Sequence, residues 1–245
     1  DSREARIILL EGAPRVLGTF TEELSQRAKE QLEGLGAEVL PGAKVTNITA
    51  FGIHYDTAAP GGQAGETINH FLPTRTVVWA AGVAASPLAR TLDVPLDRAG
   101  RVPVQPDLTL PDHPELFVAG DLAALSQADG KPVPGVAPAA KQMGKYVAEV
   151  IRARLHGKPE PGPFKYADYG NLATIGRMAA IVHLGRLQLS GVLAWWFWLA
   201  AHVFFLIGFR NRIVVLLNWA VAYWSYQRSA RIIFGDDQED RRPRR

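Results

Sequence analysis

The sequence predicts an α/β fold that continues into an apolar helical hairpin. Short apolar runs such as Arg6–Glu11 and Thr76–Gly82 end in an acidic residue or a glycine, as central strands of parallel sheets can. Between such runs, Thr21–Leu35 has the apolar spacing of an amphipathic helix, and Ala139–Arg154 is rich in helix-forming residues. From Leu187 onward the chain changes to long uncharged stretches, which predict a separate helical unit.

Length and composition restrict the classes of protein that the chain can belong to. Its 245 residues suffice for one large domain or two smaller ones, and a hydrophobic content of 47% allows a sizeable core. There is no cysteine, which excludes disulfides, thiol redox chemistry and cysteine-based metal sites in this chain. The net charge is only +3, and the one basic cluster, Arg241–Arg245, follows the acidic Asp236–Asp240. We therefore expect a solvated tail and no nucleic-acid partner.

The first third of the chain predicts a parallel unit followed by a β-meander. Thr21 is placed to cap the helix that follows the first strand. Strands are then predicted over Ala37–Leu40, as a pair of short segments within Ala43–Tyr55, and over Thr67–Leu72. Glu11 closes the first strand, and taken alone it is an ordinary polar residue at a strand end.

The stretch from His113 to Ile151 organises the middle of the chain. An apolar run predicted as a strand, Leu116–Ala119, leads into Gly120–Asp121, and a polar loop follows before the long helix. This order can present one carboxylate and the N–H groups of a helix start to a cofactor, because glycine lets the ligand approach the backbone. Ligands of open α/β sheets bind at the carboxyl ends of strands. A plain strand-to-helix turn with an aspartate cap remains the alternative.

The segment after Leu187 predicts a helical hairpin. Leu187–Phe209 runs for 23 residues without Asp, Glu, Lys or Arg, long enough as a helix to cross a bilayer core of roughly 30 Å. The second helix, Ile213–Tyr226, is 14 residues long and therefore short for a span. Trp and Tyr favour the membrane–water interface, so we expect a hairpin that lies in one leaflet. A soluble dimerisation hairpin stays open as the alternative.

Several motifs in a fixed order carry a family resemblance. They read RIILLEGAPRVLGTF, VVWAAGVAASP, LFVAGDLA, GVAPAAKQMGKYVA and FKYADYGNLATIGR, and an aromatic hairpin follows them. Together they resemble the type II NADH dehydrogenases, single-chain flavoproteins that pass electrons from NADH through FAD to a membrane quinone without pumping protons. The resemblance covers nearly the whole chain and implies part of a two-dinucleotide-binding-domain flavoprotein. The flavin carries the chemistry in such an enzyme, so no residue is assigned a catalytic role.

The resemblance implies which residues bind the cofactors. Glu11 matches the acid that receives the adenosine ribose hydroxyls of NADH, as the dinucleotide-fold rule also expects. Ala81 and Gly82 match a strand end that borders the nicotinamide pocket, although close packing of a loop on a helix explains such small residues equally well. Asp121 matches the aspartate that hydrogen-bonds the ribityl chain of FAD, with Gly120 permitting close approach.

The resemblance also implies a quinone site. Residues 137–142 resemble a helix start of pattern Ala-Gln-x-Ala-x-Gln beside the flavin and the quinone, which makes Ala137 a cofactor-binding residue and Gln142 a quinone-binding residue. Pro138 replaces the first glutamine, and proline suits a first helical turn. His202 falls where the family has a polar or aromatic residue near the quinone tunnel. Without the resemblance, Gln142 is a solvated helix residue and His202 an ordinary helix-face histidine.

The resemblance implies a domain division and predicts that the chain is a fragment. Residues 1–92 correspond to the remainder of an NADH-binding domain, residues 93–186 to the end of an FAD-binding domain, residues 187–235 to the membrane-associating hairpin and residues 236–245 to a charged tail. The chain starts at Asp1 and contains no G-x-G-x-x-G loop. The family has two such loops, which we expect before Asp1, so the chain alone is expected to be inactive.

The implied partners are a quinone and a lipid bilayer surface, with a homodimer left open and no metal expected. The implied location is peripheral and monotopic, on the cytoplasmic face of a bacterial inner membrane. Two alternatives remain. One is a soluble enzyme like the pyridine-nucleotide-disulfide reductases, and the other is a non-catalytic, membrane-attached module that binds flavin or nucleotide.

Overall fold

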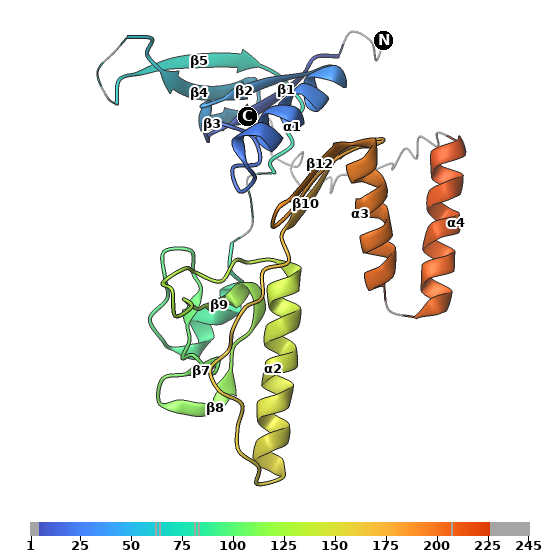
Figure 1. Cartoon of the computed structure of the whole chain (residues 1–245). Helices are drawn as coiled ribbons and strands as arrows, with labels where there is room; N and C mark the ends of the chain where they lie inside the picture. The colour runs from blue at the N-terminus through green and yellow to red at the C-terminus, as the bar shows by residue number, and fades with distance from the viewer. Residues whose placement is uncertain are drawn as a thin grey trace, which may run out of the picture.

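The computed structural model describes residues 5–225 except residues 62, 64, 81, 83 and 207, and it is a mixed α/β structure (Figure 1). Strands β1 to β5 and helix α1 form one region. Helix α2 with several short strands forms a second, and a three-stranded sheet with helices α3 and α4 forms a third. The α/β prediction is therefore confirmed. The predicted charged tail lies outside the described residues.

The first region begins with the predicted parallel unit. Strand β1 (Ile7–Glu11) pairs in parallel with β2 (Ala37–Pro41), and α1 (Glu22–Gly34) connects them. The Thr21 hydroxyl accepts a hydrogen bond from the backbone N–H of Leu24 at 3.4 Å, which confirms the predicted cap. The helix buries its apolar face against β2, because a βαβ crossover packs the helix on the sheet.

The predicted β-meander follows and is also confirmed. Strands β3 (Lys44–Thr49), β4 (Gly52–Ala58) and β5 (Thr67–Pro73) form an antiparallel sheet in chain order. Gly52 permits the close pairing of β4 and β5, since a Cβ atom there would lie 2.3 Å from the carbonyl oxygen of Leu72.

The buried strand predicted over Thr76–Gly82 is wrong. The described residues of this run adopt no strand, and Val78 and Trp79 are 85% and 64% exposed. An apolar run becomes a buried strand only where a neighbouring strand supplies hydrogen bonds and a second layer covers it. Neither is present among the residues that the structure describes.

The second region packs short strands around α2 (Ala137–Leu155). Strand β6 (Val102–Pro103) pairs with β9 (Ala123–Ala124), and β7 (Thr109–Leu110) pairs with β8 (His113–Phe117). The core beneath α2 consists of buried apolar side chains from these strands and the helix, namely Val102, Leu108, Leu110, Val118, Leu125, Val133, Met143, Tyr146, Val150 and Phe164.

The strand predicted over Leu116–Ala119 differs from the observed one. Strand β8 ends at Phe117, two residues earlier, and runs antiparallel to β7. Parallel pairing is found instead at β9, which begins two residues after Asp121 and pairs with β6. Gly120 and Asp121 lie in the short 3-10 turn Gly120–Leu122 between these two strands.

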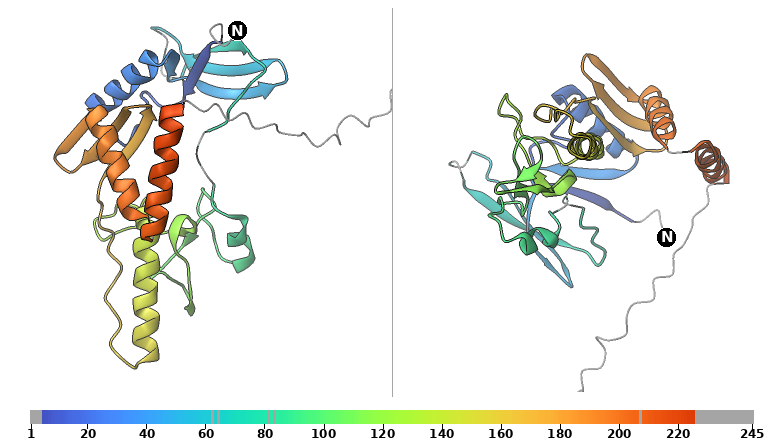
Figure 2. Two further views of the ribbon diagram at one scale, coloured as in Figure 1. Left: turned by 90° about the vertical axis from the view of Figure 1, so that its right-hand side faces the viewer. Right: turned by 90° about the horizontal axis from the view of Figure 1, so that it is seen from below.

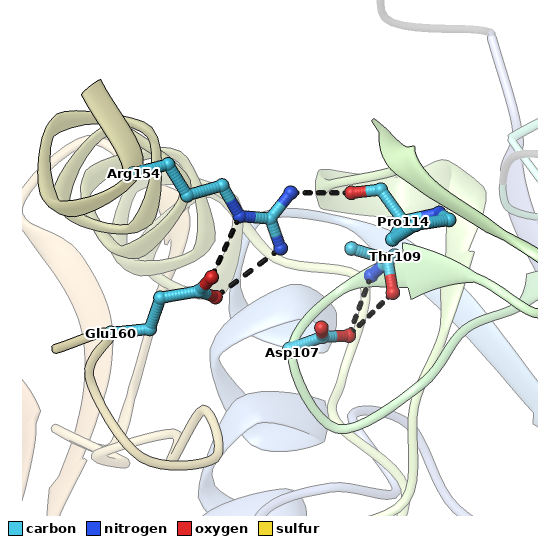
Figure 3. Close-up of polar contacts among 5 residues, drawn as sticks. All are labelled: Asp107, Thr109, Pro114, Arg154 and Glu160. Carbon is cyan, nitrogen blue, oxygen red and sulfur yellow. Dashed lines mark hydrogen bonds and ion pairs between the residues drawn. The ribbon is translucent and has the colours of Figure 1, made fainter. Parts of the chain in front are cut away.

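A polar network closes the far end of α2 (Figure 3). Arg154 donates to both carboxylate oxygens of Glu160, at 3.0 and 3.2 Å, and to the carbonyl oxygen of Pro114. In the neighbouring loop, Asp107 accepts from the backbone N–H and the hydroxyl of Thr109, at 3.1 and 2.6 Å. The bonds of Arg154 join the Pro-rich turn after α2 and strand β8 to the C-terminal end of the helix.

The third region is an antiparallel sheet that carries the hairpin. Strands β10 (Asn171–Gly176), β11 (Ala179–Leu184) and β12 (Leu187–Gly191) precede α3 (Val192–Phe205) and α4 (Phe209–Ser225). In two views the helices lie side by side, away from β1 to β5 (Figures 1 and 2).

The single helix predicted from Leu187 to Phe209 is wrong. Its first five residues form β12, which pairs with β11 across the turn at Gly185, whose φ of 57° is left-handed. An uncharged stretch does not by itself distinguish a buried strand from a helix. Helix α3 therefore has 14 residues. No helix among the described residues is both long and apolar enough to cross a bilayer.

Candidate functional site

The backbone at Gly120 is shaped by its contact with α2. Gly120 has φ of 74°, and its N–H points at the sulfur of Met143, 3.2 Å away. A Cβ atom on Gly120 would lie 3.3 Å from the Cβ of Ala140, tighter than an ordinary contact. A residue with a side chain would meet both the left-handed backbone and the helix, so glycine is the residue that suits this position.

The Asp121 carboxylate is exposed and has no hydrogen-bond or ion-pair partner in the described part of the chain. It lies beside Gly135, where a Cβ atom would be 3.6 Å from Oδ1. The start of α2 is next to it, and Val136 caps that helix without a side-chain hydrogen bond. An open carboxylate can accept hydrogen bonds from hydroxyl groups. The helix start offers the backbone N–H of Ala137 and a positive dipole end, since Pro138 has no N–H and the N–H groups of Ala139 and Ala140 donate to the carbonyl oxygen of Val136.

Glu11 lies where β1 ends, at the carboxyl edge of the parallel pair. Its Oε1 accepts from the backbone N–H of Ala13 at 2.8 Å, and the carbonyl of Ala13 accepts from the N–H of Gly42 at 2.8 Å. These bonds fix a half-buried carboxylate and leave Oε2 to accept from a hydroxyl group outside the chain. The geometry suits a vicinal diol such as a ribose, and it is adjacent to the turn where β2 ends.

Ala81 and Gly82 were expected at the end of a strand that borders a nicotinamide pocket. The described residues of Thr76–Gly82 form no such strand. Ala81 lies outside the described residues. Gly82 is exposed, has φ of 94°, and a Cβ atom there would meet no atom within 4 Å. Their cofactor role remains a prediction.

Gln142 is tied to the segment before β10. Its Nε2 donates to the carbonyl oxygen of Ala167 at 3.0 Å, and the backbone N–H of Ala167 donates to Oε1 at 2.9 Å. One amide N–H and one oxygen lone pair remain for a ligand. The alternative reading as a merely solvated residue is therefore wrong, while the quinone role stays a prediction.

His202 makes its contacts within the hairpin. Nδ1 lies 2.8 Å from the carbonyl oxygen of Trp198, and the two rings stack with centroids 4.0 Å apart. These contacts fit the ordinary helix-face histidine. Among the described residues, His202 touches neither Gln142 nor Asp121.

Sequence reasoning missed two basic residues at the hairpin. Lys141 precedes Gln142, and its Nζ lies 5.6 Å from the ring centroid of Phe205. Arg177 donates to the carbonyl oxygens of Tyr223 and Ala222, at 3.0 and 3.3 Å, and so caps the end of α4. Lys141 could have been considered from the sequence because it is next to the predicted quinone-binding residue Gln142. No sequence pattern pointed to Arg177. In the described part of the chain, no cluster of His, Asp and Glu could hold a metal ion.

Two family profiles match the chain. The profile of the pyridine nucleotide-disulphide oxidoreductases matches residues 2–144, and that of the NDH2 C-terminal domain matches residues 169–232. The first match covers β1 to the start of α2, and the second covers β10 to α4.

Curated relatives and solved structures agree with these matches. The chain is 43% identical over 234 residues to the type II NADH:quinone oxidoreductase Ndh of Mycobacterium tuberculosis, covering 93% of this chain and 48% of that protein. It is 39% identical to NdhA of the same organism, covering 90% and 46%. The structure of NDH2 from Plasmodium falciparum in complex with NADH superposes with a TM-score of 0.76 at 18% identity, covering 89% and 58%, which shows the fold alone. The chain spans about half the length of the curated relatives it matches. The resemblance stated from the sequence is confirmed.

Proposed function

Because the chain belongs to the pyridine nucleotide-disulphide oxidoreductase family, we propose that the whole protein is an FAD-dependent enzyme that oxidises NADH and reduces a membrane quinone. The observation that carries the proposal is the open Asp121 carboxylate beside the uncapped start of α2. It lies within a chain that is 43% identical to a type II NADH:quinone oxidoreductase over 93% of its length.

The residues around Asp121 fit FAD. Its unpartnered carboxylate can accept from a hydroxyl of the ribityl chain, and the missing side chain of Gly135 leaves room for the ligand beside that carboxylate. The backbone N–H of Ala137 and the positive dipole end of α2 favour a negatively polarised group of the cofactor. When bound, FAD accepts a hydride from NADH and supplies the electrons that reduce the quinone.

NADH is assigned to the edge where β1 and β2 end. The fixed carboxylate of Glu11 accepts from the ribose hydroxyls of the adenosine half, as in dinucleotide folds. A 2′-phosphate would meet this negative charge, so NADH is preferred over NADPH. We assign residues 5–92 to the NADH side, with Ala81 and Gly82 at the nicotinamide pocket, and residues 93–186 to the FAD side.

The hairpin is assigned to the membrane surface. Apolar side chains are widely exposed on it, including Leu193, Phe204, Phe205, Phe209, Leu217 and Trp224. Exposed apolar area on this scale marks an interaction surface, and helices too short to span a bilayer suit attachment to one leaflet. We place the protein peripherally on the cytoplasmic face of a bacterial inner membrane, with the quinone entering beside Gln142 and His202.

The test is an assay of the full-length protein with NADH and a short-chain quinone while the flavin absorbance is followed. NADH should bleach the flavin, and the quinone should restore its absorbance and sustain turnover. Reduction of a soluble dye in place of the quinone gives a matched control for the NADH half. A protein that binds FAD but is not reduced by NADH would favour the non-catalytic module. One that reduces only soluble acceptors would favour a soluble reductase.

A further inference from the structure

The second turn of α2 sends two neighbouring side chains to two different segments. Gln142 holds the backbone of Ala167. Lys141 reaches the other way, and its Nζ lies 5.6 Å from the ring centroid of Phe205 at the end of α3. The end of α3 and the start of α2 accordingly lie close together (Figure 2). A single helical turn thus contacts both the approach to β10 and the free end of the hairpin.

The base of the hairpin is anchored on the β10–β12 sheet. Ala194 and Trp195 of α3 are buried against that sheet, and the rings of Trp195 and Tyr223 lie 5.0 Å apart. Arg177 caps the end of α4 through the carbonyl oxygens of Tyr223 and Ala222. These contacts fix where the hairpin begins on the sheet.

The opposite end of the hairpin is much less covered. Phe204, Phe205 and Phe209 are 68%, 67% and 76% exposed. At 1.5 Å per residue, α3 is about 21 Å long, so a tilt of about 10° at the base displaces this end by roughly 4 Å. A contact at the free end therefore controls the position of the hairpin more effectively than another contact at the base.

Lys141 is suited to make this contact. Its side chain is exposed, and its ammonium forms no ion pair within the described part of the chain. Residues 187–225 contain no Asp or Glu, so no carboxylate of the hairpin competes with the aromatic ring. A cation over the face of an aromatic ring is attracted by its quadrupole.

The contact also lies next to the proposed flavin site. Ala140, the residue before Lys141, packs against Gly120, where an added Cβ atom would be 3.3 Å away. We propose that Lys141 is a positioning residue that holds the free end of the hairpin near the start of α2. In this position the hairpin directs an apolar electron acceptor toward the flavin. The expected effect of Lys141 on quinone reduction rests on the proposed function. Its effect on the position of the hairpin does not.

The first test separates acceptor use from NADH oxidation in the full-length protein on vesicles. Lys141→Met keeps the length of the side chain and removes its charge, and it should raise the quinone KM by about two- to five-fold, the range expected for one exposed cation–π contact. Lys141→Arg keeps the cation and should stay near the wild-type value. Lys145→Met, about one turn further along α2, removes another exposed lysine, whose Nζ lies 3.8 Å from Glu149, and serves as the matched control. A quinone KM unchanged in Lys141→Met would overturn the kinetic part.

The second test measures position without any turnover. This chain has no cysteine, so spin labels at Glu149→Cys on α2 and Arg210→Cys at the start of α4 report the distance between the two elements, once any cysteine elsewhere in the protein is replaced. The distance distribution should be narrow in the wild type and broaden in Lys141→Met and Phe205→Leu, but not in Lys145→Met. If it does not broaden, the positioning role is wrong. If it broadens in a protein that reduces no quinone, the positioning role stands and the proposed function fails.

Discussion

Gln142 and Ala167 hold each other through two hydrogen bonds, at 3.0 and 2.9 Å, in which the side-chain amide pairs with a backbone peptide as a neighbouring strand would. The pairing fixes the segment before β10 against the second turn of α2. Any effect of Gln142 on a bound quinone is thus combined with an effect on the position of this segment.

Replacing Gln142 should consequently change stability and acceptor use together. Gln142→Ala removes both bonds, and at about 0.5–1.5 kcal/mol each the loss of stability should be about 1–2 kcal/mol, since the site is partly exposed. The quinone KM should rise more than the NADH KM. Thermal unfolding and steady-state kinetics measure the two effects. Gln142→Glu keeps the acceptor for the N–H of Ala167 but sets a carboxylate oxygen against the Ala167 carbonyl, so it should lose at least as much stability as Gln142→Ala. A larger rise in the NADH KM than in the quinone KM would contradict the assignment.

Asp121→Ala should lose FAD. The carboxylate has no partner in the described part of the chain, so its removal breaks no bond of the fold and the melting temperature of the apoprotein should not change. The flavin-to-protein ratio after purification, read from absorbance, should fall well below that of the wild type. Asp129→Ala removes another exposed carboxylate in the nearby loop and should retain flavin. An unaltered ratio in Asp121→Ala would remove Asp121 from the cofactor site.

Glu11→Gln should weaken NADH binding and relax the preference for NADH over NADPH. The amide oxygen can still accept from the N–H of Ala13, so the turn should persist, but the charge that attracts ribose hydroxyls and repels a 2′-phosphate is lost. Hydrogen bonds to charged groups contribute about 1.5–3 kcal/mol, so the NADH KM should rise by roughly ten-fold or more. Steady-state kinetics with both nucleotides measure the change. Identical preference ratios in wild type and variant would argue against this role.

The exposed face of the hairpin should control membrane attachment. Phe209→Glu combined with Leu217→Glu places charges on side chains that are 76% and 60% exposed, so the fold should tolerate them. Flotation with lipid vesicles should show the variant in the soluble fraction. Leu155→Glu at the end of α2, a residue 79% exposed, is the matched control and should float as the wild type does. A double variant that still floats would refute the role of the hairpin.

A deletion experiment requires a boundary that the structure corrects. Cutting at Leu187 would remove β12 from its sheet, whereas a chain that ends at Gly191 keeps all three strands. The shorter deletion should abolish quinone reduction and membrane binding while NADH oxidation by a soluble dye persists. Because α3 covers part of this sheet, circular dichroism of the truncated protein is the necessary control. Quinone reduction that survives the deletion would place the acceptor site elsewhere.

Tyr146 should make stability fall at high pH. Burial raises the pKa of this phenol above its ordinary value, and its hydroxyl donates to the carbonyl oxygen of Gly162 at 2.9 Å. The folded state therefore holds the proton more tightly than the unfolded chain, so this contribution is present below about pH 10 and lost as the pH rises through the folded pKa. Tyr146→Phe should melt lower at pH 7, and the difference should shrink above pH 10. A difference that grows with pH would reverse the assignment.

The sequence predicted the local elements of the first region well. The βαβ unit with its Thr21 cap and the β-meander depend on short-range patterns, namely alternation, apolar spacing and cap chemistry, which a sequence displays directly. The predictions of secondary structure were wrong where the same apolar pattern can form a strand, a helix or an irregular segment. Thr76–Gly82 and Leu187–Gly191 are both uncharged, yet the first forms no strand in its described residues and the second does.

The sequence predicted which residues belong to the candidate site, but not which residues they contact. Glu11 and Asp121 were recognised as carboxylates that follow apolar runs, and the structure gives both an oxygen free to accept from a ligand. Gln142 came from the resemblance, whereas its two bonds to Ala167 join residues 25 positions apart and leave no periodic trace. The same holds for Lys141 and Phe205.

The sequence by itself determined the α/β character of this protein, its cysteine-free chemistry, the capped helix between two parallel strands, and the family to which its motifs belong. These properties depend on composition and on neighbours within a few positions. Only the tertiary structure decided that β12 completes a sheet and that α3 is too short to cross a bilayer. It also decided that Gln142 of α2 holds Ala167 while the preceding Lys141 meets Phe205. The physical reason is that strand pairing and side-chain contacts join residues distant in sequence, and the favourable partner is selected by packing, which no local pattern encodes.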